Sequence, residues 1–433
     1  MSNAPFTVFS DYKNVLTDFQ EHILDLYYLK ELIGSNYFSL EADGTLQIMH
    51  YVGFFQKGNT SIQILPKIYA KSDTWVYEKE ELNTSLDFLY RLLYWSGYLS
   101  HKRLPPQLSS KSETQLLELF ISIFIDEFID LFSRKINHEY VQVEENQQFI
   151  KGKILFSETT RRNPITRHMH YVRYDEYSIN NPLNRLFKSL MVELLNRTTS
   201  SNNKKQLVLG LAYLQEVDLI RLNSDKFKQI KFNRLNLDYE PLFNLAKLFY
   251  HNAQPGISEG SEKTFSFLVP VHLLFENFVA KLLEGFSNAE YKYCYHEPGL
   301  WFGKQIQNDV FELKPDFIVK QGEQVVIVAD TKFKYPFNDK GKVAISESDL
   351  YQLITYSVKC ACNNLILIYP KFMDCPNEES LLTEYKLSSP YGKISLKIIQ
   401  IDIMETDLEK ISDELMIHLD PRNTDQDSGT ISM

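Results

Sequence analysis

Apolar residues along the chain change between helical and strand spacing. Residues 15–34, VLTDFQEHILDLYYLKELIG, have apolar positions at helical spacing and end at a glycine, which predicts a helix. Residues 46–68 contain two apolar runs joined by KGNT, which predicts a β-hairpin. The pattern is helical from 85 to 135. The helix expected at 114–136 is apolar nearly all round, which is typical of a buried helix.

The second half of the chain predicts helices first and then strands. A long helix pair is expected at 182–250, interrupted by the polar run TTSSNNKK at 198–205. Strands are expected at 310–333. A further helix opens at Ser346, an N-cap residue with a carboxylate three positions later, and it leads into the buried-looking strand NLILIYP.

These elements predict an α/β multi-domain protein. Residues 251–263, HNAQPGISEGSEK, have the composition of a linker and mark the main boundary. The expected parts are an N-terminal α+β domain, a mainly helical middle region, a compact α/β domain and a disordered tail, at 1–110, 111–254, 265–420 and 421–433.

Composition narrows the class of protein. A hydrophobic content of 44% and an aromatic content of 13% are typical of an ordered globular chain. No apolar run reaches the roughly 18 residues that a membrane span requires, and the N-terminus lacks the organisation of a signal peptide. Four cysteines do not form a disulfide framework, so we expect a cytoplasmic protein without a membrane partner. The net charge of −10 argues against non-specific wrapping of nucleic acid but leaves room for a local basic groove.

Charged residues stand on two short apolar strands in KPDFIVKQGEQVVIVADTKFKY, residues 314–335. Asp330 and Lys332 are two residues apart, so on a strand they point to the same side. Asp316 lies near the start of the first strand, and Glu276 lies on the preceding helix. Three converging carboxylates form an oxygen site suited to Mg²⁺ or Mn²⁺. A lysine beside them can position a water and stabilise a phosphoryl transition state, which together suit phosphodiester hydrolysis.

The surrounding residues resemble a known nuclease family. P-D followed by D-x-K resembles the PD-(D/E)xK signature. DTKFKY followed by ESDLYQLITYSVKC and LILIYP resembles the nuclease domain of McrC, the cleavage subunit of McrBC-type restriction systems. The family's D-x-Y-Q-x-x-x-Y pattern falls on Asp349, Tyr351, Gln352 and Tyr356. YVGFFQKGNTSIQILPKI, FIKGKILFSET, YDEYSINNPLNRLFKSL and LLFENFV are also similar, so the resemblance covers most of the chain. VPVHLLFE lacks the Met-Asn pair expected before it.

The resemblance implies a fold and a set of site residues. The C-terminal domain is expected to be a restriction-endonuclease-like core, with a mixed sheet flanked by helices. Asp316, Asp330 and Lys332 are implied as the metal-binding and catalytic set, with Mg²⁺ as cofactor and Mn²⁺ as its substitute. Glu276 falls at the family's acidic helix position, as a third metal ligand. Gln352 is implied as an accessory catalytic residue; it shares a helix face with Tyr356.

The resemblance also implies partners. McrC proteins act with McrB, an AAA+ GTPase ring that recognises and translocates DNA. A McrB-like ring and double-stranded DNA are therefore expected as partners. The N-terminal region is expected to dock on the ring and to stimulate its GTPase. Dimerisation of nuclease domains during cleavage is left open. The chain contains no G-x-x-x-x-G-K-[ST] motif, so we expect no nucleotide to bind this chain alone. The alternatives are a catalytically idle regulator of the ring and a stand-alone repair or recombination nuclease.

Several residues also have plainer interpretations. Asp330 and Lys332 could form an ion pair that closes a hairpin. Lys334 is in phase with Lys332, but the D-x-K spacing favours Lys332. Between 146 and 190 eight Lys or Arg stand against three Asp or Glu, and this basic block could contact phosphates, meet the ring, supply an arginine finger or be an ordinary solvated surface. Its candidate residues are Arg161, Arg162, Arg167, Arg173, His168 and His170.

Cysteine and histidine leave two further alternatives. Cys294 precedes the expected core and Cys360, Cys362 and Cys375 follow it, an order that some iron–sulfur nucleases of this fold class use. C-x-C spacing on a helix is unusual for such a cluster, so buried free thiols are favoured. His272 lies one helical turn before Glu276; a core or interface role is favoured over metal binding.

Overall fold

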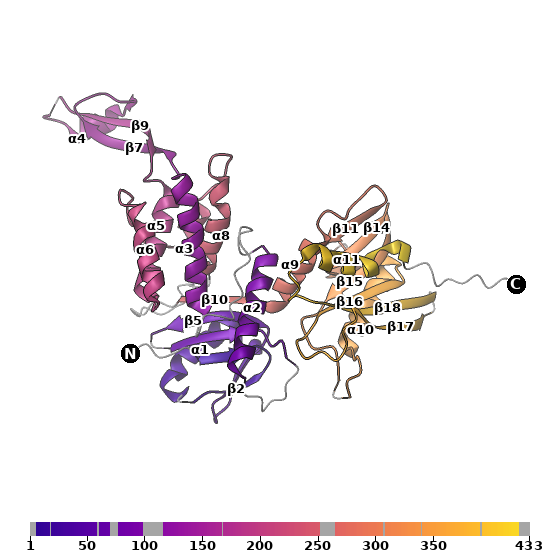
Figure 1. Cartoon of the computed structure of the whole chain (residues 1–433). Coiled ribbons are helices and arrows are strands. Elements are labelled where there is room, and N and C mark those ends of the chain that lie inside the picture. The colour runs from indigo at the N-terminus through magenta and orange to yellow at the C-terminus, as the bar shows by residue number, and fades with distance from the viewer. Residues whose placement is uncertain are drawn as a thin grey trace. The chain divides into compact units, whose positions relative to one another are not determined.

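The computed structural model of the chain confirms a mixed α/β class (Figure 1). It describes residues 6–17, 19–58, 60–69, 77–97, 116–166, 168–251, 265–305, 308–338, 340–389 and 392–423. The chain divides into two compact units, and each is discontinuous in sequence. The first contains Phe54–Gln63 and Glu113–Phe267. The second contains Phe6–Gly53, Ile64–Ser112 and Leu268–Met433.

The first unit is built on a bundle of helices with an aromatic core. Its helices are α3 (Leu116–Arg134), α5 (Pro182–Arg197), α6 (Ser201–Ala212), α7 (Ser224–Lys228) and α8 (Glu240–His251). Phenylalanines recur every four residues along α3, so they share one face. Among them Phe124 contacts Phe187 of α5 at 6.3 Å and Phe249 of α8 at 5.9 Å between ring centroids. This confirms the buried helix expected at 114–136.

The prediction of a long helix pair at 182–250 is wrong in its second half, because the helix that begins at the polar run ends at Ala212. Ser200 caps α6, its hydroxyl accepting a hydrogen bond from the backbone N–H of Asn203 at 3.3 Å. Serine, threonine and asparagine favour N-caps for this reason, so the run starts a new helix. α7 and α8 follow as separate elements.

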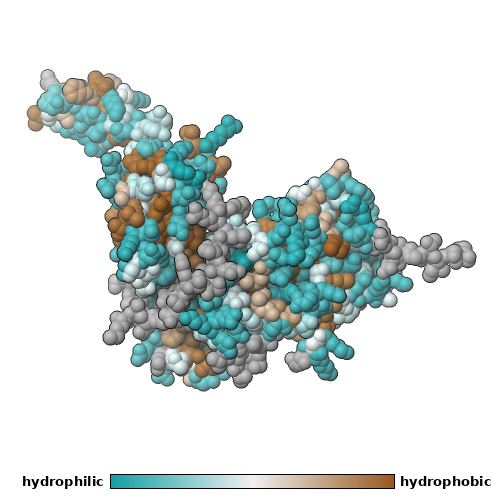
Figure 2. Space-filling view, in the orientation of Figure 1, coloured by the Kyte–Doolittle hydropathy of each residue, from teal (hydrophilic) through white to brown (hydrophobic). Residues whose placement is uncertain are grey.

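A small sheet projects from one end of this bundle (Figure 1). It consists of β7 (Glu139–Gln147), β9 (His170–Ser178) and β8 (Lys153–Ile154) in that order, all antiparallel, with the short helix α4 (Phe156–Arg162) packed on β9. We call residues 139–178 the extension. Large apolar side chains are exposed on it (Figure 2), among them Phe149, Ile150, Phe156 and Ile165.

The N-terminal quarter of the chain is built from small sheets and two longer helices. Its elements are β1 (Phe6–Phe9), β2 (Lys13–Val15), η1 (Phe19–His22), α1 (Ile23–Ile33), η2 (Ser35–Tyr37), β3 (Phe38–Leu40), β4 (Thr45–Ile48), β5 (Tyr51–Lys57), β6 (Thr60–Leu65) and α2 (Lys79–Trp95). α1 ends at Gly34, which has a φ of +94°, as predicted from the glycine. β5 and β6 are the two strands of the predicted hairpin. With β1 and β10 (Phe265–Pro270) they form a sheet in the order β1-β6-β5-β10, and β2, β4 and β3 form another.

The C-terminal part of the second unit carries a six-stranded mixed sheet. The sheet has the order β11 (Tyr291–Tyr295), β14 (Phe317–Gln321), β15 (Gln324–Thr331), β16 (Asn364–Pro370), β18 (Gly392–Ile401) and β17 (Leu381–Ser389). β16 runs parallel to both β15 and β18, and the other pairings are antiparallel. Between β11 and β14 the chain forms a separate hairpin of β12 (Trp301–Gln305) and β13 (Asn308–Glu312).

Helices flank this sheet on both faces. α10 (Glu347–Cys360) connects β15 to β16 and shares a core cluster with Cys294 of β11. The hydroxyl of Tyr293 instead bonds the carbonyl of Leu419, in α11 (Leu408–Leu419). Neighbouring strand residues point to opposite faces, so α10 and α11 lie on opposite sides. α9 (Val271–Leu283) packs against α11, β15 and α2.

The ends of the predicted domains are only partly covered by the described residues. A short 3-10 helix, η5 (Pro421–Asn423), extends three residues past the predicted end of the C-terminal domain. The remainder of the predicted tail, and most of the predicted linker at 251–263, lie outside the described residues. The predicted domain boundaries stay predictions. Within the part of the chain that the structure describes, no helix is long and apolar enough to cross a membrane.

Candidate active site

Strand pairing brings Asp316 and Asp330 together at one edge of the mixed sheet. β14 and β15 pair with Phe317 opposite Ala329, so the residue before β14 lies beside the end of β15. Oδ2 of Asp316 accepts hydrogen bonds from the backbone N–H and the hydroxyl of Thr331, at 2.7 and 2.6 Å. These two bonds fix the orientation of the Asp316 carboxylate.

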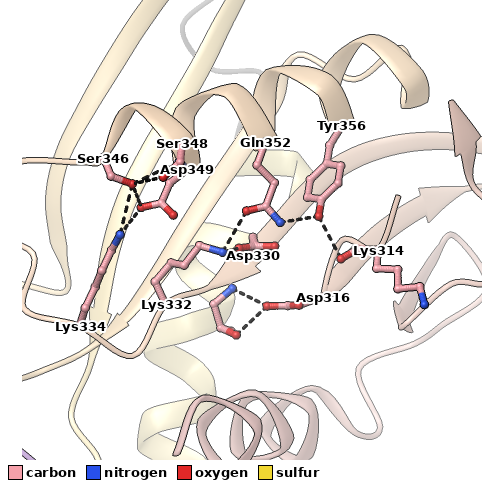
Figure 3. A network of polar contacts seen from close by, with 11 residues as sticks. Lys314, Asp316, Asp330, Lys332, Lys334, Ser346, Ser348, Asp349, Gln352 and Tyr356 are labelled. Atoms are coloured by element: carbon pink, nitrogen blue, oxygen red, sulfur yellow. Dashed lines mark hydrogen bonds and ion pairs between the residues drawn. The ribbon is translucent and has the colours of Figure 1, made fainter. Parts of the chain in front are cut away.

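Asp330 and Lys332 lie on the same side of the chain and form an ion pair (Figure 3). Asp330 is only 1% exposed, so its charge is almost fully removed from water. The Lys332 ammonium also donates to Oε1 of Gln352 at 3.1 Å. Gln352 donates to the hydroxyl of Tyr356 at 2.7 Å, and that hydroxyl donates to the carbonyl of Lys314 at 3.0 Å. A continuous polar chain therefore links β15, α10 and the segment before β14.

Lys334 is not part of this chain of contacts. β15 ends at Thr331, so the strand phase that would align Lys334 with Lys332 no longer applies. The Lys334 ammonium instead pairs with Asp349, whose carboxylate accepts a hydrogen bond of 2.6 Å from Ser346 (Figure 3). Asp349 of the D-x-Y-Q pattern thus fixes the start of α10.

Glu276 and His296 complete the site on its other side. Glu276 lies on the face of α9 that is buried and is 6% exposed. Nε2 of His296, the residue after β11, contacts Oε1 of Glu276. Three potential metal-ligand atoms lie within 4.8 Å of one another: a ring nitrogen of His296 and one carboxylate oxygen each from Glu276 and Asp316. His296 was not predicted, because a single histidine after a strand belongs to no recognisable pattern.

Electrostatics at this edge disfavour several buried negative charges. Burial, followed by repulsion from Asp316, raises the pKa of Glu276 well above its usual range. The same two causes raise the pKa of Asp330, although the Lys332 ammonium opposes them. Burial alone would lower the pKa of Lys332, but Asp330 outweighs it and raises that pKa, so the lysine stays protonated. Carboxylates in this state gain free energy when a cation lies between them.

The donor set fits a divalent cation. Two carboxylates and an imidazole are ligands for Mn²⁺ and related metals, and carboxylates with water suit Mg²⁺. Glu276 and Asp316 come together as the predicted ligand set requires. Asp330 instead has its carboxylate held by Lys332, so its role as a third ligand stays a prediction.

The candidate residues of the basic block belong to the extension, and three of its arginines form ion pairs there. Glu158 pairs with both Arg161 and Arg162, and Glu144 pairs with Arg173. Arg167 lies outside the described residues, and His168 and His170 also belong to the extension. These surface pairs are compatible with every interpretation left open by the sequence.

The cysteines lie mainly in the apolar core. Cys294 and Cys362 belong to the cluster under α10, and Cys360 packs against it. Burial raises the pKa of all three thiols, that of Cys362 to about 11. Iron–sulfur ligation requires thiolates, so this environment favours buried thiols.

The side chain of His272 contacts His50, whereas that of Glu276 contacts His296. The ring of His272 meets the ring of His50 edge-on, with 6.0 Å between centroids. The backbone N–H of Val271 donates to the carbonyl of His50 at 2.7 Å, so the start of α9 is fixed to the turn between β4 and β5. The ring of His272 is placed at a contact between elements of the second unit, as the favoured interpretation requires.

Comparison with known proteins agrees with the sequence resemblance. Residues 46–370 match the family model of the McrBC 5-methylcytosine restriction system component. No curated protein sequence matches the chain. A chain in the refined half-complex from the tetradecameric assembly of Thermococcus gammatolerans McrB AAA+ hexamers with bound McrC is similar in fold, with 22% identity and a TM-score of 0.71 over 97% of this chain and 99% of that chain.

A chain of the Thermococcus gammatolerans McrBC complex solved by cryo-EM is 24% identical over 66% of this chain and 88% of that chain, with a TM-score of 0.46. The first structure supports a shared fold across almost the whole length. The family match covers most of the sequence, including every residue of the polar chain described above. The protein therefore belongs to the McrBC family of restriction system components, as its resemblance to McrC predicted.

Proposed function

We propose that this chain is the McrC-type subunit of a GTP-dependent restriction complex, in which its C-terminal domain hydrolyses DNA phosphodiester bonds. The observation that carries the proposal is the arrangement of Asp316, Asp330 and Lys332 at one edge of a mixed sheet. This arrangement has the character of a PD-(D/E)xK nuclease core. The chain has no P-loop motif, which favours the McrC-type role over that of the GTPase.

A divalent cation would be held by Glu276 and Asp316, with Asp330 nearby, and Mg²⁺ is the proposed cofactor. When bound, such an ion polarises a phosphoryl oxygen and lowers the pKa of a water.

Lys332 supplies a second positive charge at the site, in addition to that of the cation. Asp330 and Gln352 hold its ammonium in place, so no reorganisation is required when negative charge develops on the phosphate. Tyr356 in turn positions Gln352 through the 2.7 Å hydrogen bond between them. The proposed partners are a McrB-type AAA+ ring, whose GTP hydrolysis this chain stimulates, and double-stranded DNA.

The test is DNA cleavage by Asp330→Asn, with the ring, GTP and Mg²⁺ present. We expect the cleavage rate to fall about 10³-fold, while stimulated GTP turnover in the same reaction is unchanged. Asp413→Asn, an exposed position on α11, is the matched control and should cleave as the wild type does. Cleavage by Asp330→Asn at the wild-type rate would leave this chain a regulator of the ring. Cleavage by the wild type without the ring would instead indicate a stand-alone nuclease.

A further inference from the structure

His296 is placed at the proposed metal site by constraints on both its backbone and its side chain. Its φ is +48°, in the left-handed region that residues other than glycine seldom adopt. Its backbone N–H donates to the carbonyl of Asp316 at 3.0 Å. Its ring stacks on Tyr295 with 4.0 Å between centroids and an interplanar angle of 20°. An unusual backbone conformation therefore directs this imidazole toward the carboxylates.

The three side chains around this point come from three different elements. Glu276 comes from α9, His296 follows β11 and Asp316 precedes β14. Their ligand atoms lie within 4.8 Å of one another. Ligands bound at about 2.1 Å to an octahedral ion lie about 3 Å apart when adjacent and about 4.2 Å apart when opposite. The bound of 4.8 Å lies just above this range, so small movements of the side chains would let one ion contact all three ligand atoms.

We infer that His296 is a ligand of the divalent cation, so that Glu276, His296 and Asp316 form a mixed nitrogen and oxygen site that favours Mn²⁺ over Mg²⁺. The inference rests on the proposed function and identifies the metal that this site selects. Imidazole binds first-row transition metals well, whereas Mg²⁺ prefers oxygen ligands and water. A site with a nitrogen ligand therefore discriminates between the two ions more strongly than one made of carboxylates alone.

The geometry also supplies a fixed ligand environment. Thr331 orients the Asp316 carboxylate through two hydrogen bonds, and Tyr295 supports the His296 ring from one side. His296 is half exposed, so the site has access for an ion and for water. The plainer interpretation is that His296 only forms a polar contact with Glu276, and the experiment must separate that from metal binding.

The experiment uses the full-length chain without a histidine tag, titrated with Mn²⁺ and observed by pulsed electron paramagnetic resonance. We expect the wild-type spectrum to contain the modulation of a directly bound ¹⁴N nucleus. His296→Gln should lose this signal and bind Mn²⁺ about 10-fold or more weakly, while its Mg²⁺ affinity changes only about 2-fold. His272→Gln is the matched control, because it removes the other histidine near Glu276, and it should retain the signal.

His296→Asp provides a second variant in case glutamine disturbs the fold. It should lose the ¹⁴N signal but bind Mg²⁺ at least as tightly as the wild type does, since an oxygen ligand replaces the nitrogen. Bound Mn²⁺ without a ¹⁴N signal in the wild type, or with a signal that survives in His296→Gln, would overturn the inference. Loss of the signal in His272→Gln alone would assign the ligand to His272 and also overturn it.

The two proposals fail in different ways. A wild-type chain that binds Mn²⁺ with the ¹⁴N signal but does not cleave DNA with the ring and GTP would contradict the proposed function and leave the ligand assignment standing. Cleavage that depends on Asp330, in a protein whose bound Mn²⁺ carries no ¹⁴N signal, would contradict the ligand assignment alone. A chain that binds neither ion would contradict both.

Discussion

The active-site edge of the mixed sheet and the extension both concentrate charged residues, but they treat those charges differently. At the edge, Asp330 is 1% exposed and its carboxylate faces other carboxylates as well as a single lysine. On the extension, Arg173 and Glu144 are 40% and 37% exposed, and each has its own partner at the surface. Burial and mutual orientation of charged side chains therefore indicate a catalytic site far better than their number does.

A half-buried carboxylate in the helical bundle refines this comparison. Glu118 of α3 accepts hydrogen bonds from Thr198 at 2.5 Å, from the backbone N–H of Thr199 at 2.6 Å and from Asn203 at 2.7 Å. Burial raises its pKa, but these donors outweigh burial and hold the pKa below its usual range. A partly buried charge surrounded by hydrogen-bond donors stabilises the fold, whereas a buried charge surrounded by like charges favours the binding of a ligand of opposite charge.

The largest effect is expected from Lys332→Met. Removing the ammonium leaves Asp330 buried without its partner and removes the positive charge offered to the phosphate, so DNA cleavage should fall about 10³-fold. Lys334→Met is the matched control two residues further on, where the lysine pairs with Asp349, and cleavage should fall less than about 10-fold. Initial rates with the ring, GTP and Mg²⁺ measure both. Equal losses in the two variants would remove the distinction between them.

Glu118→Gln should reduce the free energy of unfolding by about 2 kcal/mol near pH 7, without altering the catalytic constants. The folded pKa lies below the unfolded one, so the stabilisation is present above the ordinary glutamate pKa and is lost as the pH falls through the folded pKa. The difference between wild type and variant should therefore shrink in acid. Urea unfolding at neutral and acidic pH measures this, and a difference independent of pH would contradict it.

Gln352→Ala should lower kcat about 10-fold and leave KM nearly unchanged, because Gln352 positions Lys332. Gln321→Ala serves as control, since that side chain bonds Glu290 at the exposed end of β14. Steady-state cleavage kinetics distinguish the two. A rise in KM with constant kcat would assign Gln352 to substrate binding.

The smallest effect is expected on the extension. Arg173→Ala should change the free energy of unfolding by less than about 0.5 kcal/mol, because exposed ion pairs contribute little. A double-mutant cycle with Glu144→Ala in urea measures the coupling directly. A coupling above about 1 kcal/mol would show that the contrast between the two regions is too simple.

Local spacing was sufficient to predict most of the site. The period of two places Asp330 and Lys332 on one side of the chain, and the spacing of four places Gln352 and Tyr356 on one face of α10. β14 and β15 are neighbours in sequence, so the place of Asp316 beside Asp330 follows from a simple hairpin. The resemblance to McrC added Glu276.

His296 could not be predicted, because its place depends on the pairing of strands that are separated in sequence. Tyr295 of β11 lies opposite Phe317 of β14, and this register alone brings the next residue beside Asp316. The hairpin of β12 and β13 lies between those strands in the sequence. Each compact unit is assembled from segments that are separated in sequence. The composition along the chain could not predict this, because it does not say which segments contact one another.

The discontinuity of the second unit has a consequence for the order of events during synthesis. Phe6–Gly53 leaves the ribosome before Glu113–Phe267 has been made, and Leu268–Met433 leaves it afterwards. Contacts between residues distant in sequence form slowly, whereas the helices of the first unit find most of their neighbours within a single uninterrupted segment. The proposed active site would therefore mature last, so that a nascent or truncated chain acquires its helical bundle before it acquires the proposed nuclease activity.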